Sequence, residues 1–127
     1  MRRFTGLLVL GLALVGACNS SDSTAPGGGT LTGSYSLKTV NGSTLPYNFP
    51  NGLVLVSETL TLGADGSYTD LATYNSGQQS TEFGSYSALN NSVTFHDQTD
   101  NITYSGSVSA DVLTEISNGY TSVYQRN

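Results

Sequence analysis

The chain has 127 residues, with four Lys and Arg against nine Asp and Glu, and a formal net charge of −5 at pH 7. So acidic a chain cannot neutralise a run of phosphates, which excludes nucleic acid as a partner. It contains one Cys, so no intramolecular disulfide can form, and the folded part must be stable without one.

Residues 1–17 have the pattern of an export signal. Arg2 and Arg3 give a positive start, and an uncharged, largely apolar run from Phe4 to Val15 follows. About 12 residues span roughly 18 Å as a helix, which is too short for a hydrocarbon core of about 30 Å. The sequence therefore predicts a signal peptide and not a transmembrane helix.

Small residues, Gly16 and Ala17, directly precede Cys18. This pattern resembles the lipobox of bacterial lipoproteins, which implies cleavage before Cys18 and its acylation with two or three chains. Two chains hold a protein firmly at a membrane, whereas one holds it only marginally. An ordinary signal peptide with an incidental cysteine is the alternative. Because Asn19 replaces the Asp of the inner-membrane sorting pattern, the resemblance favours the outer membrane, facing the periplasm or the surface.

Residues 18–30 form the predicted lipidated linker, because they are rich in Ser, Gly and Thr and lack an apolar period. Such a composition gives a flexible tether with a reach of about 20 Å.

Removal of residues 1–17 leaves Lys38 and Arg126 against the nine acidic residues, a net charge of −7. Residues 31–127 are then one domain with one modest core.

Short runs rich in Val, Thr, Tyr and Leu recur in this domain about every 8–12 residues, with no convincing 3.6-residue period. The turn sequences Asp65-Gly66, Asn90-Asn91 and Asn118-Gly119 favour tight hairpins, so consecutive strands are antiparallel neighbours. The predicted strands are Gly33–Val40, Leu53–Leu62, Ser67–Tyr74, Ser80–Ala88, Ser92–His96, Ile102–Val108, Val112–Ile116 and Tyr120–Arg126.

An eight-stranded meander has two exposed edges unless it closes on itself. We therefore predict an all-β fold, an eight-stranded antiparallel up-and-down barrel, with an open β-sandwich as the alternative. Alternation along the strands assigns an inner face to Val54, Val56, Leu60, Leu62, Val93, Phe95, Ile102, Tyr104, Gly106 and Val108.

Several short motifs resemble the lipocalin-like (calycin) barrels found in bacterial lipoproteins. They are Gly33-Ser34-Tyr35, where the family has Gly-x-Trp, then Asp65-Gly66-Ser67-Tyr68 and Gly84-Ser85-Tyr86. The resemblance implies that Arg126 on the last strand packs over the Tyr35 ring. It also implies a large first loop at the barrel mouth, here residues 41–52, which carries Tyr47 and Phe49 between two prolines. This loop is predicted to be either a lid that touches a ligand or a hydrophobic plug.

The eight Tyr residues are either the lining of a pocket or the filling of a small barrel. Glu58 shares the predicted inner face, where it could bind a cation or an amine, or else lie at the rim or pair with Lys38 or Arg126. The candidate ligand-binding residues are Tyr47, Phe49, Glu58, Tyr68, Tyr86 and Tyr104.

His96 is the single histidine and stands beside Asp97, but adjacent side chains on a strand point to opposite faces. We therefore predict no catalytic residues and no enzyme activity. The segment with His96, Asp97, Asp100 and Asn101 could hold Ca²⁺, but it lacks the spacing of a calcium loop, so a solvated turn is expected. No metal and no cofactor are predicted.

These features predict an envelope lipoprotein that acts as a non-catalytic binding module for a small apolar or amphipathic ligand. The alternative is a protein–protein interaction module with a filled barrel, either an envelope assembly partner or a hydrolase inhibitor.

Overall fold

A computed structural model describes residues 31–127 of the chain. The predictions for the signal peptide, for Cys18 and for the linker lie outside these residues. No helix in the described part is long and apolar enough to cross a membrane. The strands are β1 Gly33–Val40, β2 Ser43–Thr44, β3 Tyr47–Asn48, β4 Val54–Leu62, β5 Ser67–Tyr74, β6 Gln79–Leu89, β7 Ser92–Asp97, β8 Ile102–Ser109, β9 Val112–Ser117 and β10 Tyr120–Arg126.

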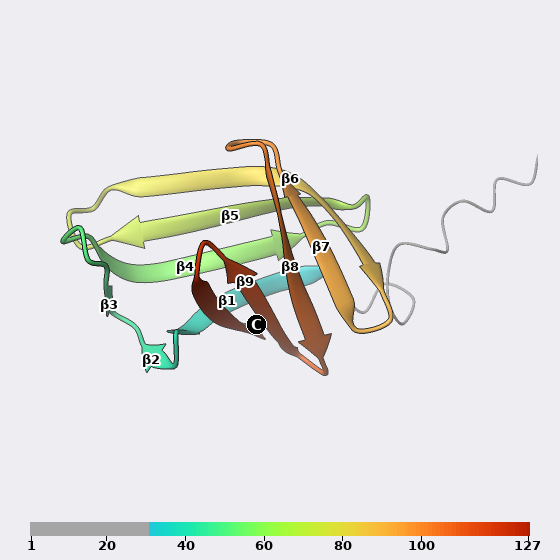
Figure 1. Cartoon of the computed structure of the whole chain (residues 1–127), viewed down its shortest axis with the longest axis horizontal. Helices are drawn as coiled ribbons and strands as arrows, with labels where there is room; N and C mark the ends of the chain where they lie inside the picture. Colours follow the sequence, from blue (N-terminus) through green and yellow to red (C-terminus); the bar gives the residue numbers. More distant parts are fainter. Residues whose placement is uncertain (1–30) are drawn as a thin grey trace, which may run out of the picture.

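The eight long strands form one antiparallel barrel (Figure 1). From β4 to β10 each strand pairs with the next, β10 pairs with β1, and β1 pairs with β4 from Gly33 opposite Leu62 to Ser36 opposite Thr59. This last pairing leaves no free edge among the long strands. The predicted barrel is confirmed, and the open sandwich is wrong.

The predicted strand limits agree with the structure to within one residue at each end. The first loop differs, because residues 41–52 contain two short strands. β2 pairs with the end of β1, and β3 pairs with the start of β4. The loop is therefore tied by backbone hydrogen bonds to both sides of the seam where the barrel closes.

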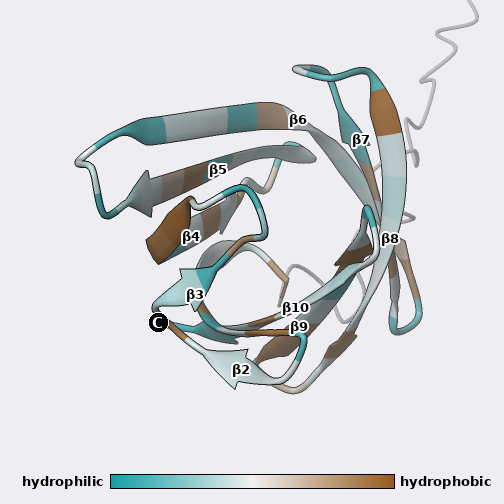
Figure 2. Ribbon diagram, turned by 60° about the vertical axis from the view of Figure 1, so that its left-hand side comes forward, coloured by the Kyte–Doolittle hydropathy of each residue, from teal (hydrophilic) through white to brown (hydrophobic). Residues whose placement is uncertain are grey.

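The two ends of the barrel differ. Residues 41–53, 75–78, 98–101 and 118–119 connect strands at one end, which we call the open end. The opposite end, which we call the closed end, carries the turns after β4, β6 and β8. Figure 2 shows the strands curving round a common axis, with β8 across from β4 and β5.

Aromatic side chains fill much of the interior. The Phe95 ring stacks on Tyr104 with centroids 5.0 Å apart and meets Tyr68 edge-on at 5.3 Å, and Tyr86 lies at 6.4 Å. The hydroxyl of Tyr104 donates to that of Tyr68 at 3.3 Å, and that of Tyr86 donates to the Gly63 carbonyl at 2.6 Å. Each ring is thus packed while its polar atom keeps a partner.

A β-bulge in β4 corrects the predicted inner face. The pairing of β4 with β5 shifts register between Leu55 and Ser57, so that Leu55 is 2% exposed and Val56 is 46% exposed. The extra residue in the bulge reverses the alternation of inward and outward side chains along β4. Counting every second residue back from Leu62 therefore predicts the wrong face for the residues that precede Ser57. Val56 was wrongly assigned to the interior, whereas the inward position of Leu60 and Leu62 is confirmed. Ile102 lies on the expected face of β8 but is exposed.

Candidate functional site

A cavity of about 260 Å³ lies at the open end of the barrel. Its wall combines four carboxylates, three aromatic rings, and small or aliphatic side chains. The lining residues are Glu58, Asp70, Glu82, Glu115, Phe49, Tyr74, Tyr120, Val40, Leu55, Ala72, Ser80, Ser117, Asn118 and Ser122. The closed half of the interior is packed, so the barrel is neither wholly filled nor wholly hollow.

The carboxylates come from four strands, and we call three of them, Glu58, Asp70 and Glu115, the acidic cluster. Asp70 of β5 stands directly opposite Glu82 of β6 in the strand register. Like charges at directly opposed positions of an antiparallel pair are destabilising. The pair therefore costs stability when both groups are ionised, unless a positive charge lies between them.

The carboxylates of the acidic cluster are buried, but not all of their oxygens have a hydrogen-bond partner. Asp70 is 9% exposed and Glu115 is 7% exposed. Asp70 Oδ1 and Glu115 Oε2 have no hydrogen-bond partner among the described residues. Glu58 differs, because the Tyr124 hydroxyl donates to its Oε1. A buried polar atom without a partner is costly, so each of these two oxygens is a vacant acceptor in the wall of the cavity.

The same burial changes the protonation of the cluster. Desolvation and then the nearby charges of Glu58 and Glu115 hold the pKa of Asp70 well above its ordinary value. Desolvation, with the charges of Glu58 and Glu82, raises the pKa of Glu115 to about 8. Burial also raises the pKa of Glu58, although the Tyr124 hydrogen bond opposes it. Within the acidic cluster, Glu115 is therefore largely protonated at neutral pH and can exchange its proton for a cation.

Aromatic rings form one side of the opening. The Phe49 ring meets Tyr120 edge-on with centroids 5.3 Å apart, and Tyr47 meets both rings at 5.1 and 6.3 Å. Phe49 and Tyr120 line the cavity. The loop of residues 41–53 therefore builds one wall of the opening and does not plug the barrel.

The candidate ligand-binding residues fall into two groups. Phe49 and Glu58 line the cavity, and Tyr47 packs behind Phe49. Tyr68, Tyr86 and Tyr104 are instead part of the packed interior around Phe95, outside the cavity lining.

Glu58 does not pair with either basic residue of the domain. Lys38 is exposed on β1, and Arg126 pairs with Asp111 at the closed end, Nε to Oδ1 3.2 Å. The polar partner of Glu58 is instead the Tyr124 hydroxyl. Glu58 is thus an inward carboxylate in the cavity wall.

Three cavity carboxylates were absent from the candidates: Asp70, Glu82 and Glu115. The sequence carries a signal for each of them, since Glu82 precedes Gly84 and Tyr86 at the inward spacing of β6. Asp70 lies between Tyr68 and Ala72 at the inward spacing of β5, and Glu115 follows Leu113 at the same spacing in β9. An acidic residue at a position that period-2 counting assigns to the interior is the pattern to look for.

His96 and Asp97 point to opposite sides of β7, as adjacent strand residues must. His96 is exposed, and its Nδ1 lies 3.2 Å from Thr103 Oγ1. Asp97 faces the interior and is fully buried. The two side chains therefore cannot act as a His–Asp pair.

Two solved structures share this architecture. A lipocalin-like protein from Bacteroides uniformis matches with a TM-score of 0.54 and 16% identity, over 78% of this chain and 100% of that chain. The fold is lipocalin-like. An uncharacterized protein from Bacteroides eggerthii also matches the lipocalin-like barrel, with a TM-score of 0.51 and 12% identity over 76% of this chain and 98% of that one. No protein-family model and no curated protein matches the sequence.

Proposed function

We propose that the protein is a non-catalytic binding module whose barrel holds the basic head group of a small amphipathic ligand. The observation that carries the proposal is the pair of vacant, buried acceptors, Asp70 Oδ1 and Glu115 Oε2, in the wall of an open cavity. An ammonium group has donors but no acceptors, so it can give both carboxylate oxygens the hydrogen-bond partner that they lack.

The charge of the wall distinguishes between the two ligand classes that the sequence predicted. A purely apolar ligand would cover the carboxylates without giving them a partner, which costs free energy. A cation compensates the repulsion between Asp70 and Glu82. The rings of Phe49, Tyr74 and Tyr120 offer apolar surface and aromatic faces that attract an organic cation. An amphipathic amine satisfies both halves of the wall.

The size of the cavity limits the ligand. Typical pockets for drug-sized ligands have volumes of about 300–1,000 Å³. A volume of about 260 Å³ falls below this range and suits a small amine with a short apolar part. A longer apolar tail would extend out of the opening past Phe49 and Tyr120.

The place where the module works is also a proposal. The residues around Cys18 resemble a lipobox, which implies a lipid anchor in the cell envelope, in the outer membrane facing the periplasm or the surface. The membrane is then a partner through the lipid alone, because a domain of net charge −7 is repelled by anionic headgroups.

A matched series of probes tests the proposal on the barrel, residues 31–127, whose closed sheet contains its own buried core. Hexylamine, hexanol and heptanoate share one apolar hexyl chain and differ in head group. We expect calorimetry to show saturable binding of hexylamine alone, with a loss of at least tenfold in Glu115→Gln and Asp70→Asn. Asp65→Asn, at an exposed turn of the closed end, is the matched control and should bind like the unmodified protein.

Two results would contradict the proposal. Equal binding of hexanol and hexylamine would show that the carboxylates do not select the ligand. Absence of any amine binding, together with a stoichiometric protein partner recovered from the host envelope, would favour the interaction module instead. Native mass spectrometry of protein purified from its host adds a direct measurement, because a co-purifying basic compound is the expected result.

A further inference from the structure

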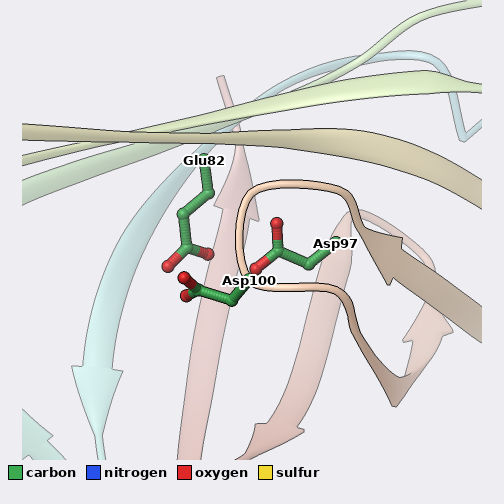
Figure 3. Close-up of side chains that lie close together, drawn as sticks. All are labelled: Glu82, Asp97 and Asp100. Carbon is green, nitrogen blue, oxygen red and sulfur yellow. The ribbon is translucent and has the colours of Figure 1, made fainter.

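A second group of carboxylates lies beside the cavity, at the junction of β6, β7 and the turn that follows β7. One oxygen from each of Glu82, Asp97 and Asp100 lies within 4.8 Å of the other two. Figure 3 shows Glu82 reaching from β6 toward Asp100, with Asp97 turned toward both from the start of the turn. We call these three residues the loop carboxylates. They bring three formal negative charges into a space of a few ångströms.

Asp97 sets this group apart from an ordinary acidic surface. Its side chain is fully buried, and its Oδ1 accepts a hydrogen bond from the Thr99 backbone N–H at 2.7 Å. Its Oδ2 has no hydrogen-bond partner among the described residues. A fully buried carboxylate oxygen without a partner is rare in folded proteins, since its desolvation is not compensated. The vacant acceptor belongs to the carboxyl group that faces Glu82 and Asp100.

The turn that carries Asp100 is fixed against β6. The Gln98 N–H donates to the Phe83 carbonyl at 2.9 Å, and the Phe83 N–H donates to Thr99 Oγ1 at 3.1 Å. Both the N–H and the carbonyl of Phe83, the neighbour of Glu82, are therefore hydrogen-bonded to the turn. These hydrogen bonds hold Asp100 close to Glu82, although their like charges repel each other.

We propose that Glu82, Asp97 and Asp100 together bind one Ca²⁺ ion. Ca²⁺ takes six to eight oxygen ligands at about 2.3–2.6 Å, so oxygens on opposite sides of one ion are up to about 5 Å apart. The three carboxylates fit within that span, and water can complete the shell because Asp100 is exposed. Mg²⁺ requires a tighter octahedron at about 2.0–2.1 Å, which this spacing suits less well.

Within residues 31–127 no basic side chain takes the place of such an ion. The salt bridge of this part of the chain joins Arg126 to Asp111 at the closed end, and His96 points out of the barrel. The sequence predicted a solvated turn here because residues 96–101 alone lack the spacing of a calcium loop. The third ligand, Glu82, comes from another strand and lies fifteen residues before Asp97, so linear spacing could not reveal it.

This inference does not rest on the proposed amine ligand: Glu82 borders both sites, but Asp97 and Asp100 do not line the cavity. The test uses the full chain in a non-ionic detergent, freed of metal by a chelator that is then removed. Calorimetric titration with CaCl₂ should give one ion per chain with a dissociation constant of about 10⁻⁵ to 10⁻³ M. Thermal unfolding, followed by tyrosine circular dichroism, should shift upward with Ca²⁺ and return after EDTA.

Variants at the three ligands separate the ion site from other effects. Glu82→Gln and Asp100→Asn change groups that are not fully buried, so they should fold, and each should weaken Ca²⁺ binding at least tenfold. Asp97→Asn should abolish it. Asp65→Asn is the control and should retain the unmodified affinity.

Three results would overturn the proposal: no saturable Ca²⁺ binding at about 10 mM, tighter binding of Mg²⁺ than of Ca²⁺, or unchanged Ca²⁺ affinity in all three variants. Loss of Ca²⁺ binding in Asp70→Asn but not in Glu82→Gln or Asp100→Asn would also overturn it, because the ion would then belong to the acidic cluster. Hexylamine binding is measured in a separate titration. Failure of the Ca²⁺ proposal therefore leaves the amine proposal testable, and failure of the amine proposal leaves the Ca²⁺ proposal testable.

Discussion

The guanidinium carbon of Arg126 lies 4.9 Å from the centroid of the Tyr35 ring, and the two residues are direct partners across β1 and β10. This is the contact that the lipocalin resemblance implied. Arg126 Nη1 also donates to the Thr32 carbonyl at 2.5 Å, while the Tyr35 hydroxyl donates to the Leu31 carbonyl at 2.8 Å. The pair therefore covers the closed end and binds the segment that leads into β1.

Replacement of Arg126 should destabilise the barrel. Arg126→Ala removes a cation–π contact, a hydrogen bond to a backbone carbonyl and the ion pair with Asp111. We expect a loss of about 1–3 kcal/mol in the free energy of unfolding, measured by urea denaturation. Arg126→Lys should recover only part of it, because Lys lacks the planar fork. Lys38→Ala, at an exposed position of the same barrel, is the control; an equal loss there would contradict the assignment.

Stability should depend on pH through Glu115. Burial raises the pKa of Glu115 from 4.5 to about 8, so the folded protein binds a proton that the unfolded chain has released. This contribution is complete below about pH 4.5 and is lost as the pH rises through about 8. The contribution of Glu115 to the free energy of unfolding is at most about 5 kcal/mol, and water that enters the open cavity reduces it.

The Glu115→Gln variant, which cannot ionise, should flatten the fall in unfolding free energy between pH 5 and pH 9. Part of the slope will remain, since the pKa values of Glu58 and Asp70 are raised in the same direction. Asp65→Asn is the control, because hydrogen bonds from Ser67 lower the pKa of Asp65 and place its titration below this window. An unchanged slope in Glu115→Gln would show that this carboxyl is solvated.

Gly84 should not tolerate a side chain. It pairs with both Tyr68 and Asp97 in the sheet, and a Cβ at this position would overlap the His96 carbonyl and lie 3.0 Å from the Tyr68 ring. Gly84→Ala should therefore cost about 1–3 kcal/mol or more of unfolding free energy, measured by denaturation. The neighbouring outward position offers the matched control, Ser85→Ala, for which a change within about 0.5 kcal/mol is expected. Equal effects of the two substitutions would contradict the close approach.

Cys18 should determine where the protein is found. Cys18→Ala removes the acylated thiol, so the exported protein should move from the membrane fraction to the soluble fraction of its host, measured by fractionation and by intact mass. Ser20→Ala, two residues away, is the control and should stay with the membrane. An unmodified thiol in the mass of the membrane-bound protein would contradict lipidation.

Much of the fold was predictable because its signals are local. The turns Asp65-Gly66 and Asn118-Gly119 place positive φ at Gly66, Asn118 and Gly119, as tight hairpins require, and period-2 alternation identifies β7 and β8. The bulge beside Val56 was not predictable, because an extra residue leaves no mark in composition. β2 and β3 were also missed, since two-residue strands depend on pairing with β1 and β4 and not on propensity.

The site was predictable only in part. Phe49 and Glu58 were found, since a loop aromatic and an inward carboxylate stand out in one sequence. Glu82 was missed because its partners, Asp70 on one side and Asp97 with Asp100 on the other, come together only through strand register and a turn. Tyrosine richness suggested a pocket, but Tyr68 and Tyr104 serve the packed interior.

The pairing of β1 with the end of β4 places the entry of the chain and the cavity at opposite ends of the barrel. The chain enters the barrel at Leu31, beside Arg126 and the turn at Asp111, and the cavity opens at the far end of the same strands. An acyl anchor at Cys18 would therefore attach to the barrel at the end away from the cavity. Since the predicted linker is flexible and reaches about 20 Å, the barrel would stand clear of the bilayer with its opening accessible from the aqueous side.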